Sequence, residues 1–270
     1  MSVVEGTLSK ARKYRSADPI KGAARPIAKS LGAFIERVPT REFPMATLDE
    51  TVLERNCVLP QVADRAAIHA YKFLRTRLLH RLAAERWRSV AVTSTKPGEG
   101  KTLTSINLAV SLSREPNTRV CLADFDLLRP QVAIQMGLDC EWGLDDYLLG
   151  DAEPLQVMYG CGSQSLIVIP NKRPFGNSSE MLASARMTEL LKSIETEMPN
   201  HVVIFDMPPL TYDDVLSFAP QVDCVLLVIA EGQTERADLT KAKELLEGMR
   251  LVGVVLNRSA ERASKSYYYY

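Results

Sequence analysis

The 270-residue chain has 33 Lys and Arg against 33 Asp and Glu, so its formal net charge is zero. This balance disfavours a nucleic-acid partner, because nucleic-acid binders carry a marked excess of basic residues. Hydrophobic residues make up 46% of the chain, and its five Cys include no Cys-x-x-Cys pair, which disfavours a disulfide framework and a zinc site. The N-terminus also lacks the apolar core of a secretory signal. We therefore expect a cytoplasmic protein.

The first sixty residues contain scattered prolines and no long apolar period, which predicts a basic, partly disordered extension. Residues 1–40 hold eight Lys and Arg against three Asp and Glu. This segment is either simply solvated or binds an acidic partner or the anionic inner leaflet of a membrane. We expect the folded domain, with a leading helix, to span 61–258 and a flexible tyrosine-rich tail to span 259–270.

The alternation of apolar patterns predicts the fold class. Apolar residues recur at helical spacing over 62–87, and short runs rich in Val, Ile and Leu then alternate with longer helical patterns. The predicted strands are 89–94, 119–124, 165–170, 201–206, 223–230 and 251–257, and the predicted helices are 102–114, 178–198, 213–219 and 234–249. Near-continuous apolar strands are typical of a mainly parallel sheet that is covered on both faces. We therefore expect a doubly wound α/β fold.

The first of these strands runs into Thr95-Lys96-Pro97-Gly98-Glu99-Gly100-Lys101-Thr102, and a helical pattern follows. A strand, a Gly-rich turn, Gly-Lys-Thr and a helix in this order predict a P-loop, whose backbone amides bind phosphate oxygens. Lys101 would contact the β- and γ-phosphates, and the hydroxyl of Thr102 would bind Mg²⁺. Gly98, Glu99 and Gly100 would complete the loop around the nucleotide. We expect ATP, because the Asn171-Lys172 pair lacks the Asp of a guanine-reading motif.

Lys96 occupies the second position of this loop. MinD- and ParA-like ATPases are similar at this position and carry there a signature lysine that reaches the nucleotide of a dimer partner. Lys96 is therefore either a nucleotide-binding residue of this kind or an exposed loop lysine.

Acidic residues follow two of the predicted strands. Asp124 and Asp126 lie at the end of strand 119–124, and Asp206 ends strand 201–206. The carboxyl ends of strands in open α/β sheets meet at the ligand crevice, and an apolar run that ends in Asp is typical of a Walker B carboxylate. We expect Asp124 and Asp206 to bind Mg²⁺ together with Thr102, and the Asp124–Asp126 pair to supply the general base.

From about residue 62 to the C-terminus, the motifs together resemble the bacterial tyrosine kinases (BY-kinases) of capsule and exopolysaccharide synthesis. The matching segments are Pro97-Gly98-Glu99-Gly100-Lys101-Thr102, Asn107-Leu108-Ala109, Asp124-x-Asp126-Leu127-x-Arg129-Pro130, Gly143-Leu144-x-Asp146-Tyr147-Leu148, Ser179-Glu180-Met181-Leu182-Ala183-Ser184, Asp206-x-Pro208-Pro209 and Gly253-Val254-Val255-Leu256-Asn257. The resemblance implies an ATP- and Mg²⁺-dependent autokinase that regulates polysaccharide polymerisation and export. It also implies catalytic roles for Lys101, Asp124 and Asp126, and an adenine contact for Asn257.

The chain departs from the family's pattern in two places. Leu128 stands where the family often has Arg, and His69 replaces the acid of a Glu-x-x-Arg-x-x-Arg motif through which the family assembles rings. We therefore expect the ring to be weak. The family's membrane activator is absent, so the resemblance implies a separate transmembrane chain-length regulator as partner. It further implies self-association, a phosphotyrosine phosphatase, and a peripheral location at the inner face of the membrane.

Four tyrosines, Tyr267, Tyr268, Tyr269 and Tyr270, end the sequence. Packing gives no reason for such a cluster, so we predict that they are the phosphoacceptors, the alternative being an aromatic plug that docks on a partner. A rival function is a MinD/ParA-like ATPase switch that uses Lys96 and water instead of tyrosine. A third is a nucleotide-binding adaptor without catalytic activity.

Overall fold

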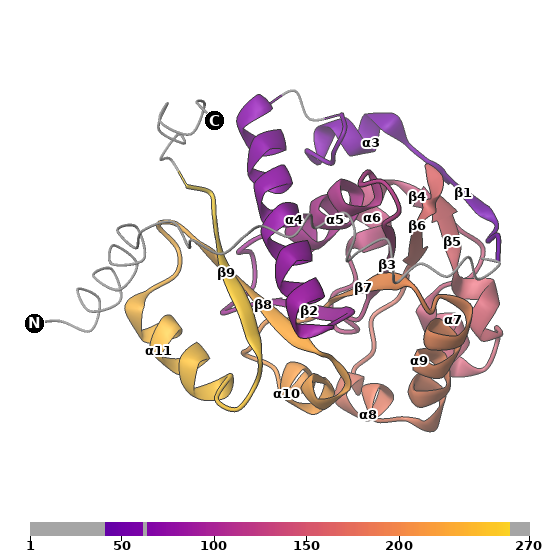
Figure 1. Cartoon of the computed structure of the whole chain (residues 1–270). Helices are drawn as coiled ribbons and strands as arrows, with labels where there is room; N and C mark the ends of the chain where they lie inside the picture. Colours follow the sequence, from indigo (N-terminus) through magenta and orange to yellow (C-terminus); the bar gives the residue numbers. More distant parts are fainter. Residues whose placement is uncertain (1–40, 62–63, 260–270) are drawn as a thin grey trace, which may run out of the picture. The chain divides into compact units, whose positions relative to one another are not determined.

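The computed structural model describes residues 41–61 and 64–259. One β-sheet forms the centre of this part of the chain (Figure 1). The strands are β1 (Met45–Leu48), β2 (Ser89–Ser94), β3 (Arg119–Asp124), β4 (Leu138–Asp139), β5 (Tyr159–Cys161), β6 (Ser163–Ile169), β7 (His201–Asp206), β8 (Cys224–Ala230) and β9 (Leu251–Asn257). Their order in the sheet is β4-β1-β5-β6-β3-β7-β2-β8-β9. The pairs from β6 to β9 are all parallel, whereas β5 pairs antiparallel with β6 and β4 antiparallel with β1. The predicted mainly parallel sheet is confirmed.

Helices cover both faces of this sheet, as the sequence predicts for a doubly wound fold. They are α3 (Glu50–Arg55), α4 (Arg65–Glu85), α5 (Lys101–Ser113), α6 (Val132–Met136), α7 (Leu144–Leu149), α8 (Ser178–Leu182), α9 (Ala185–Glu197), α10 (Asp214–Phe218) and α11 (Arg236–Leu245), with 3₁₀ turns at Pro154–Val157 and Ala219–Gln221. Alternate strand residues enter two separate cores, because successive side chains of a strand point to opposite faces. Leu122 packs with α4 and α5, while Cys121 and Ala123 pack with α7 to α11.

The folded unit begins before residue 61, where we placed the start of the domain. β1 joins the sheet between β4 and β5, and Asp49 caps α3 by accepting hydrogen bonds from the backbone of Thr51 and Val52. Leu53 of α3 is buried in the same core as α4 and α5. Periodicity missed this segment because a four-residue strand and a six-residue helix are too short to show a repeat. Residues 1–40, which we expect to be basic and partly disordered, lie outside the described residues.

The predicted helix 178–198 is interrupted. α8 ends at Leu182 and α9 begins at Ala185, because the Ser184 hydroxyl caps the second helix by accepting a hydrogen bond from the Met187 amide at 3.1 Å. Such a local side-chain bond favours a helix start over a helix interior. In the described part of the chain, no helix is both long and apolar enough to cross a membrane.

Candidate active site

The Gly-rich segment predicted as a P-loop connects β2 to α5 at the carboxyl edge of the sheet. Gly98 and Gly100 have φ angles of +85° and +90°, a region that side chains other than glycine rarely adopt. A Cβ atom at Gly100 would also collide with the side-chain amide of Asn257. The turn leaves Lys101 as the first residue of α5, so the helix N-terminus points its free amides toward the loop.

The side chain of Glu99 holds the loop in place through hydrogen bonds. Its carboxylate is completely buried and accepts hydrogen bonds from the Thr95 hydroxyl at 2.7 Å, from the Lys96 amide at 3.0 Å and from the Thr234 hydroxyl. The Glu99 carbonyl accepts a further bond from the side-chain amide of Asn257 at 2.9 Å. Both residues therefore hold the loop to the ends of β8 and β9, and their contacts with a nucleotide stay a prediction.

Lys101 lies among three acidic side chains at the carboxyl ends of β3 and β7. Its ammonium is 2.6 Å from Asp126 and 3.8 Å from Asp206. The Thr102 hydroxyl donates to Asp206 at 2.7 Å, and the Ser105 hydroxyl, one helical turn later, donates to the same carboxylate at 2.9 Å. The two acidic strand ends that the sequence places at one edge therefore meet at the P-loop lysine.

Asp124 lies deeper than Asp126. One of its oxygens accepts the backbone amides of Gln131 and Val132 at 3.0 and 2.9 Å, while the other, also buried, has no hydrogen-bond partner among the described residues. A buried carboxylate oxygen without a partner is costly, so this atom is available to a ligand.

Burial and like charge dominate the electrostatics of the cluster. Burial, followed by the charge of Asp206, raises the pKa of Asp124 well above its usual range, and burial also raises the pKa of Asp206 despite the nearby ammonium of Lys101. Burial opposes the charged form of Lys101, but the charges of Asp206 and Asp126 outweigh it and raise the pKa of this lysine. The site therefore holds more buried negative charge than one lysine can neutralise.

A pocket of about 390 Å³ opens in front of the loop. Its lining includes five residues of the predicted loop and Asp126, together with residues from α6 and from the segments that follow β7 and β9. The lining residues are Pro97, Gly98, Gly100, Lys101, Thr102, Leu103, Asp126, Leu128, Arg129, Gln131, Gln135, Pro209, Tyr212 and Arg258. Among the predicted site residues, Gly98, Gly100, Lys101, Thr102 and Asp126 thus share one cavity wall.

Lys96 does not line this pocket. Its ammonium is 2.6 Å from Asp238 on α11, in the same chain, and the hydrogen bond to Asp238 raises the pKa of Lys96. The predicted phosphoacceptors, Tyr267 to Tyr270, lie outside the described residues.

Sequence reasoning missed several residues of the site. Arg258 lines the pocket and donates to the Gly98 carbonyl at 2.8 Å, and its position next to Asn257 was the available signal. Ser105 follows Lys101 by one helical turn, so helical periodicity could have placed it on the same face. The contribution of Thr234 had no local signal, because it depends on the approach of two loops that are 135 residues apart.

The oxygen ligands present suit a magnesium ion, although no three His, Cys, Asp or Glu side chains of the described residues converge in a metal-binding arrangement. Mg²⁺ usually takes only one or two carboxylates and completes its shell with water and substrate phosphates. The unpartnered oxygen of Asp124 and the Thr102 hydroxyl beside Asp206 are donors of this kind.

Comparisons with known proteins agree with this geometry. A family model named ParA, described as the NUBPL iron-transfer P-loop NTPase, matches residues 86–267. Tyrosine-protein kinase YwqD of Bacillus subtilis (strain 168) is 31% identical over 221 residues, which cover 81% of this chain and 92% of that protein. Tyrosine-protein kinase CpsD of Streptococcus pneumoniae serotype 4 is 30% identical over 66% of this chain and 78% of its own length.

Among solved structures, the kinase domain of the Escherichia coli tyrosine kinase ETK superposes with a TM-score of 0.68 at 27% identity, over 85% of each chain. The similarity in sequence and the similarity in structure thus lead to proteins of the same name, tyrosine kinases. By its relatives and by its fold, this chain belongs to the bacterial tyrosine-protein kinases, a family of ParA-like P-loop NTPases.

Proposed function

We propose that the protein is an ATP- and Mg²⁺-dependent tyrosine autokinase that phosphorylates its own C-terminal tyrosines, Tyr267 to Tyr270. The observation that carries this proposal is the convergence of Lys101, Asp126 and Asp206 at the P-loop, where Lys101 and Asp126 line the pocket. The four clustered tyrosines supply acceptors in the same chain.

In this reaction the phenol oxygen of a tyrosine attacks the γ-phosphorus of ATP, the bond to ADP breaks, and the phenol proton passes to Asp126. The Lys101 ammonium pairs with the Asp126 carboxylate at 2.6 Å. When nucleotide phosphates attract the ammonium, the carboxylate of Asp126 becomes available as a proton acceptor. Catalysis then rests on positioning and charge neutralisation, as is usual for phosphoryl transfer.

Asp124, Thr102 and Asp206 are the residues that would hold Mg²⁺. The ion would supply further positive charge against the nucleotide phosphates. The unpartnered oxygen of Asp124 and the raised pKa of this group support the assignment, since a cation would relieve both costs.

We further propose that this activity regulates the polymerisation and export of a capsular or exopolysaccharide. In this proposal a separate transmembrane chain-length regulator activates the kinase at the inner face of the membrane, and the kinase self-associates. A phosphotyrosine phosphatase then removes the phosphates from the tail. The membership of the chain in the tyrosine-kinase family supports these roles.

The central test is a variant in which Tyr267, Tyr268, Tyr269 and Tyr270 are all changed to Phe. The variant keeps the aromatic bulk and the nucleotide site, so it should bind and slowly hydrolyse ATP yet carry little phosphotyrosine. Mass spectrometry after incubation with ATP and Mg²⁺ measures this. Most of the phosphate at other tyrosines, such as Tyr147 or Tyr159, would contradict the assignment of the tail.

The match to the ParA family model favours a second candidate, an ATPase switch that cycles a dimer without phosphorylating tyrosine. In that function Lys96 would leave its own chain to contact a partner's nucleotide. In this structure Lys96 pairs with Asp238 of its own chain, but an exposed ion pair of this kind costs little to break. The tyrosine-kinase relatives and the four clustered tyrosines favour the kinase.

A further inference from the structure

The outward face of α4 is strongly basic although the whole chain is neutral. The helix contains five Lys and Arg and a single acid, Glu85, at its last residue. Its exposed side chains follow helical spacing on one side, whereas Leu78 and Leu82 pack inward on the core shared with α5. The exposed residues of this basic face are Arg65, His69, Lys72, Phe73, Thr76, Arg77, His80 and Arg81.

Three cations of the basic face have no acidic partner. Arg65, Lys72 and Arg77 take part in none of the ion pairs between described residues, and the Arg77 guanidinium instead lies 4.8 Å from the centre of the Phe73 ring. Arg75, by contrast, turns inward to Glu115 at 2.8 Å. The face therefore offers positive charge that nothing in the described part of the chain neutralises.

This charge pattern selects the kind of partner. Two copies of α4 packed face to face would bring like charges together, which is costly at an interface. A ring contact through this helix is weakened as well, because His69 stands where the family's interface motif has its acid. Residues 1–40 carry an excess of Lys and Arg, so they are no better matched. The complementary group is a dense anion, and for Arg and Lys the strongest match is phosphate.

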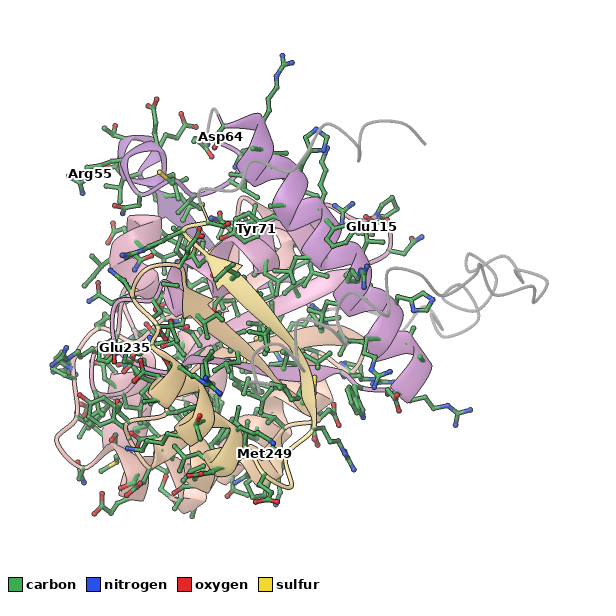
Figure 2. All side chains as sticks on the ribbon, turned by 90° about the vertical axis from the view of Figure 1, so that its left-hand side faces the viewer. Arg55, Asp64, Tyr71, Glu115, Glu235 and Met249 are labelled. Atoms are coloured by element: carbon green, nitrogen blue, oxygen red, sulfur yellow. The ribbon has the colours of Figure 1, made fainter. Side chains whose placement is uncertain are left out.

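The tyrosine tail starts close to this helix. The Tyr71 phenol of α4 lies beside Thr104 and Asn107 of α5, and the Thr104 hydroxyl donates to the Gly100 carbonyl at 2.8 Å. Gly100 in turn contacts Asn257, the last residue of β9. Figures 1 and 2 show β9 beside α4, with Tyr71 on the side of the helix next to the end of that strand.

The length of the tail is sufficient for contact. Residues 260–270, extended, span about 36 Å, and the whole of α4 is about 31 Å long. Tethering adds an effective concentration in the millimolar range, so weak ionic contacts suffice to hold the tail.

We propose that the phosphorylated tail of this chain docks on the basic face of α4, with phosphotyrosines against Arg65, Lys72 and Arg77. The proposal rests on the autokinase function for the source of the phosphates. Each phosphotyrosine adds about −1.5 to −2 charges, so docking appears only after the reaction. The same charge repels the tail from Asp124, Asp126 and Asp206, so phosphorylation transfers the tail from the nucleotide site to α4.

The test uses a synthetic peptide of residues 259–270 with all four tyrosines phosphorylated, added to the full-length, phosphatase-treated protein with saturating ADP and Mg²⁺. Fluorescence anisotropy should show binding of this peptide and none of its unphosphorylated form. Because the phosphates are installed chemically, the result does not depend on whether the protein phosphorylates itself. Failure of the autokinase function would instead appear in the mass spectrometry of the tail.

The variant that breaks the contact changes Arg65, Lys72 and Arg77 to Gln. We expect roughly tenfold weaker peptide binding, because three exposed charge contacts are lost. The matched control changes three exposed lysines to Gln on helices that cover the other face of the sheet, Lys192, Lys241 and Lys243. This control loses the same charge and should bind the peptide as the unaltered protein does.

Both triple variants should form phosphotyrosine at the normal rate, since neither touches the pocket. Equal binding of the phosphopeptide to the two triple variants, or no binding of the phosphopeptide to the unaltered protein, would overturn the proposal. Binding of the phosphopeptide only when ADP is left out, with no effect of the α4 substitutions, would place the phosphates at the P-loop instead and would also overturn the proposal.

Discussion

Two lysines of one loop, Lys96 and Lys101, are five positions apart in the sequence and lie in different electrostatic surroundings. Lys101 begins α5, is almost fully buried, and lies between Asp126 and Asp206. Lys96 precedes the glycine turn, is about one-third exposed, and pairs with Asp238 on α11. The loop therefore has an inner side, which faces the pocket, and an outer side, which contacts α11.

Glu99 separates these two sides. Its buried carboxylate binds Thr95 and the Lys96 backbone on the outer side, while the next residue, Gly100, turns the chain into the helix that starts at Lys101. Substitutions on the inner side should therefore affect chemistry most, those at Glu99 should affect stability most, and those on the outer side should affect neither.

The largest effect is expected for Lys101→Met. Phosphotyrosine formation should fall by roughly a hundredfold or more, because a positioned positive charge on the transferred phosphate is lost. The unfolding free energy should fall by roughly 1–3 kcal/mol, because Asp126 and Asp206 lose their buried cation. Anti-phosphotyrosine detection and chemical denaturation measure the two effects.

Lys96→Met is the control for this substitution, since it removes the same charge from the other side of the loop. The comparison of inner and outer sides fails if the two methionine variants lose phosphotyrosine to a similar extent.

An intermediate effect is expected at Glu99. Glu99→Ala should lower the unfolding free energy by roughly 2–4 kcal/mol, because three hydrogen-bond donors lose a buried acceptor. Glu99→Gln should cost about 1 kcal/mol, because its amide can still accept from the two threonines but opposes the Lys96 amide with a second donor. Nucleotide binding, measured by calorimetry, should weaken in the same order.

Thr234→Val removes the contact that crosses from the loop to the segment after β8, together with the hydrogen bond that the Thr234 hydroxyl accepts from the Ala230 amide at 2.9 Å. It should cost about 1–2 kcal/mol, since two hydrogen bonds are lost while Glu99 keeps its other donors. A cost equal to that of Glu99→Ala would mean that this single contact, and not the whole set, holds the loop.

The smallest effect is expected for the outer ion pair. Lys96→Ala and Asp238→Asn should each leave the melting temperature within about 2 °C of the unaltered protein, because exposed ion pairs add little stability. Phosphotyrosine formation should change by less than about twofold. Loss of ATP hydrolysis and of ATP-dependent dimerisation in Lys96→Ala, with phosphotyrosine intact, would show that the lysine serves a dimer contact as well.

Strong local patterns in the sequence predicted most of the fold. Continuous apolar runs gave β2, β3 and β7 with the same bounds as the structure, because strands buried on both faces leave little choice of residue. The same patterns missed β1, β4 and β5, which have two to four residues and lie beyond β6 in the sheet. β1 pairs with β4 and β5, which lie far from it in the sequence, so local periodicity gives no signal of these pairs.

The candidate site, like the fold, could be predicted from the sequence only in part. Sequence alone determined the residue types and their order: the glycine turn, Lys101 and Thr102, and the acids at two strand ends, since each follows from local chemistry along one strand and one turn. Only the tertiary structure decided which of them face the pocket. In the folded chain Lys96 pairs with Asp238, Glu99 is buried against Thr234, and Arg258 lines the cavity. These contacts join segments more than 130 residues apart, so no local pattern predicts them.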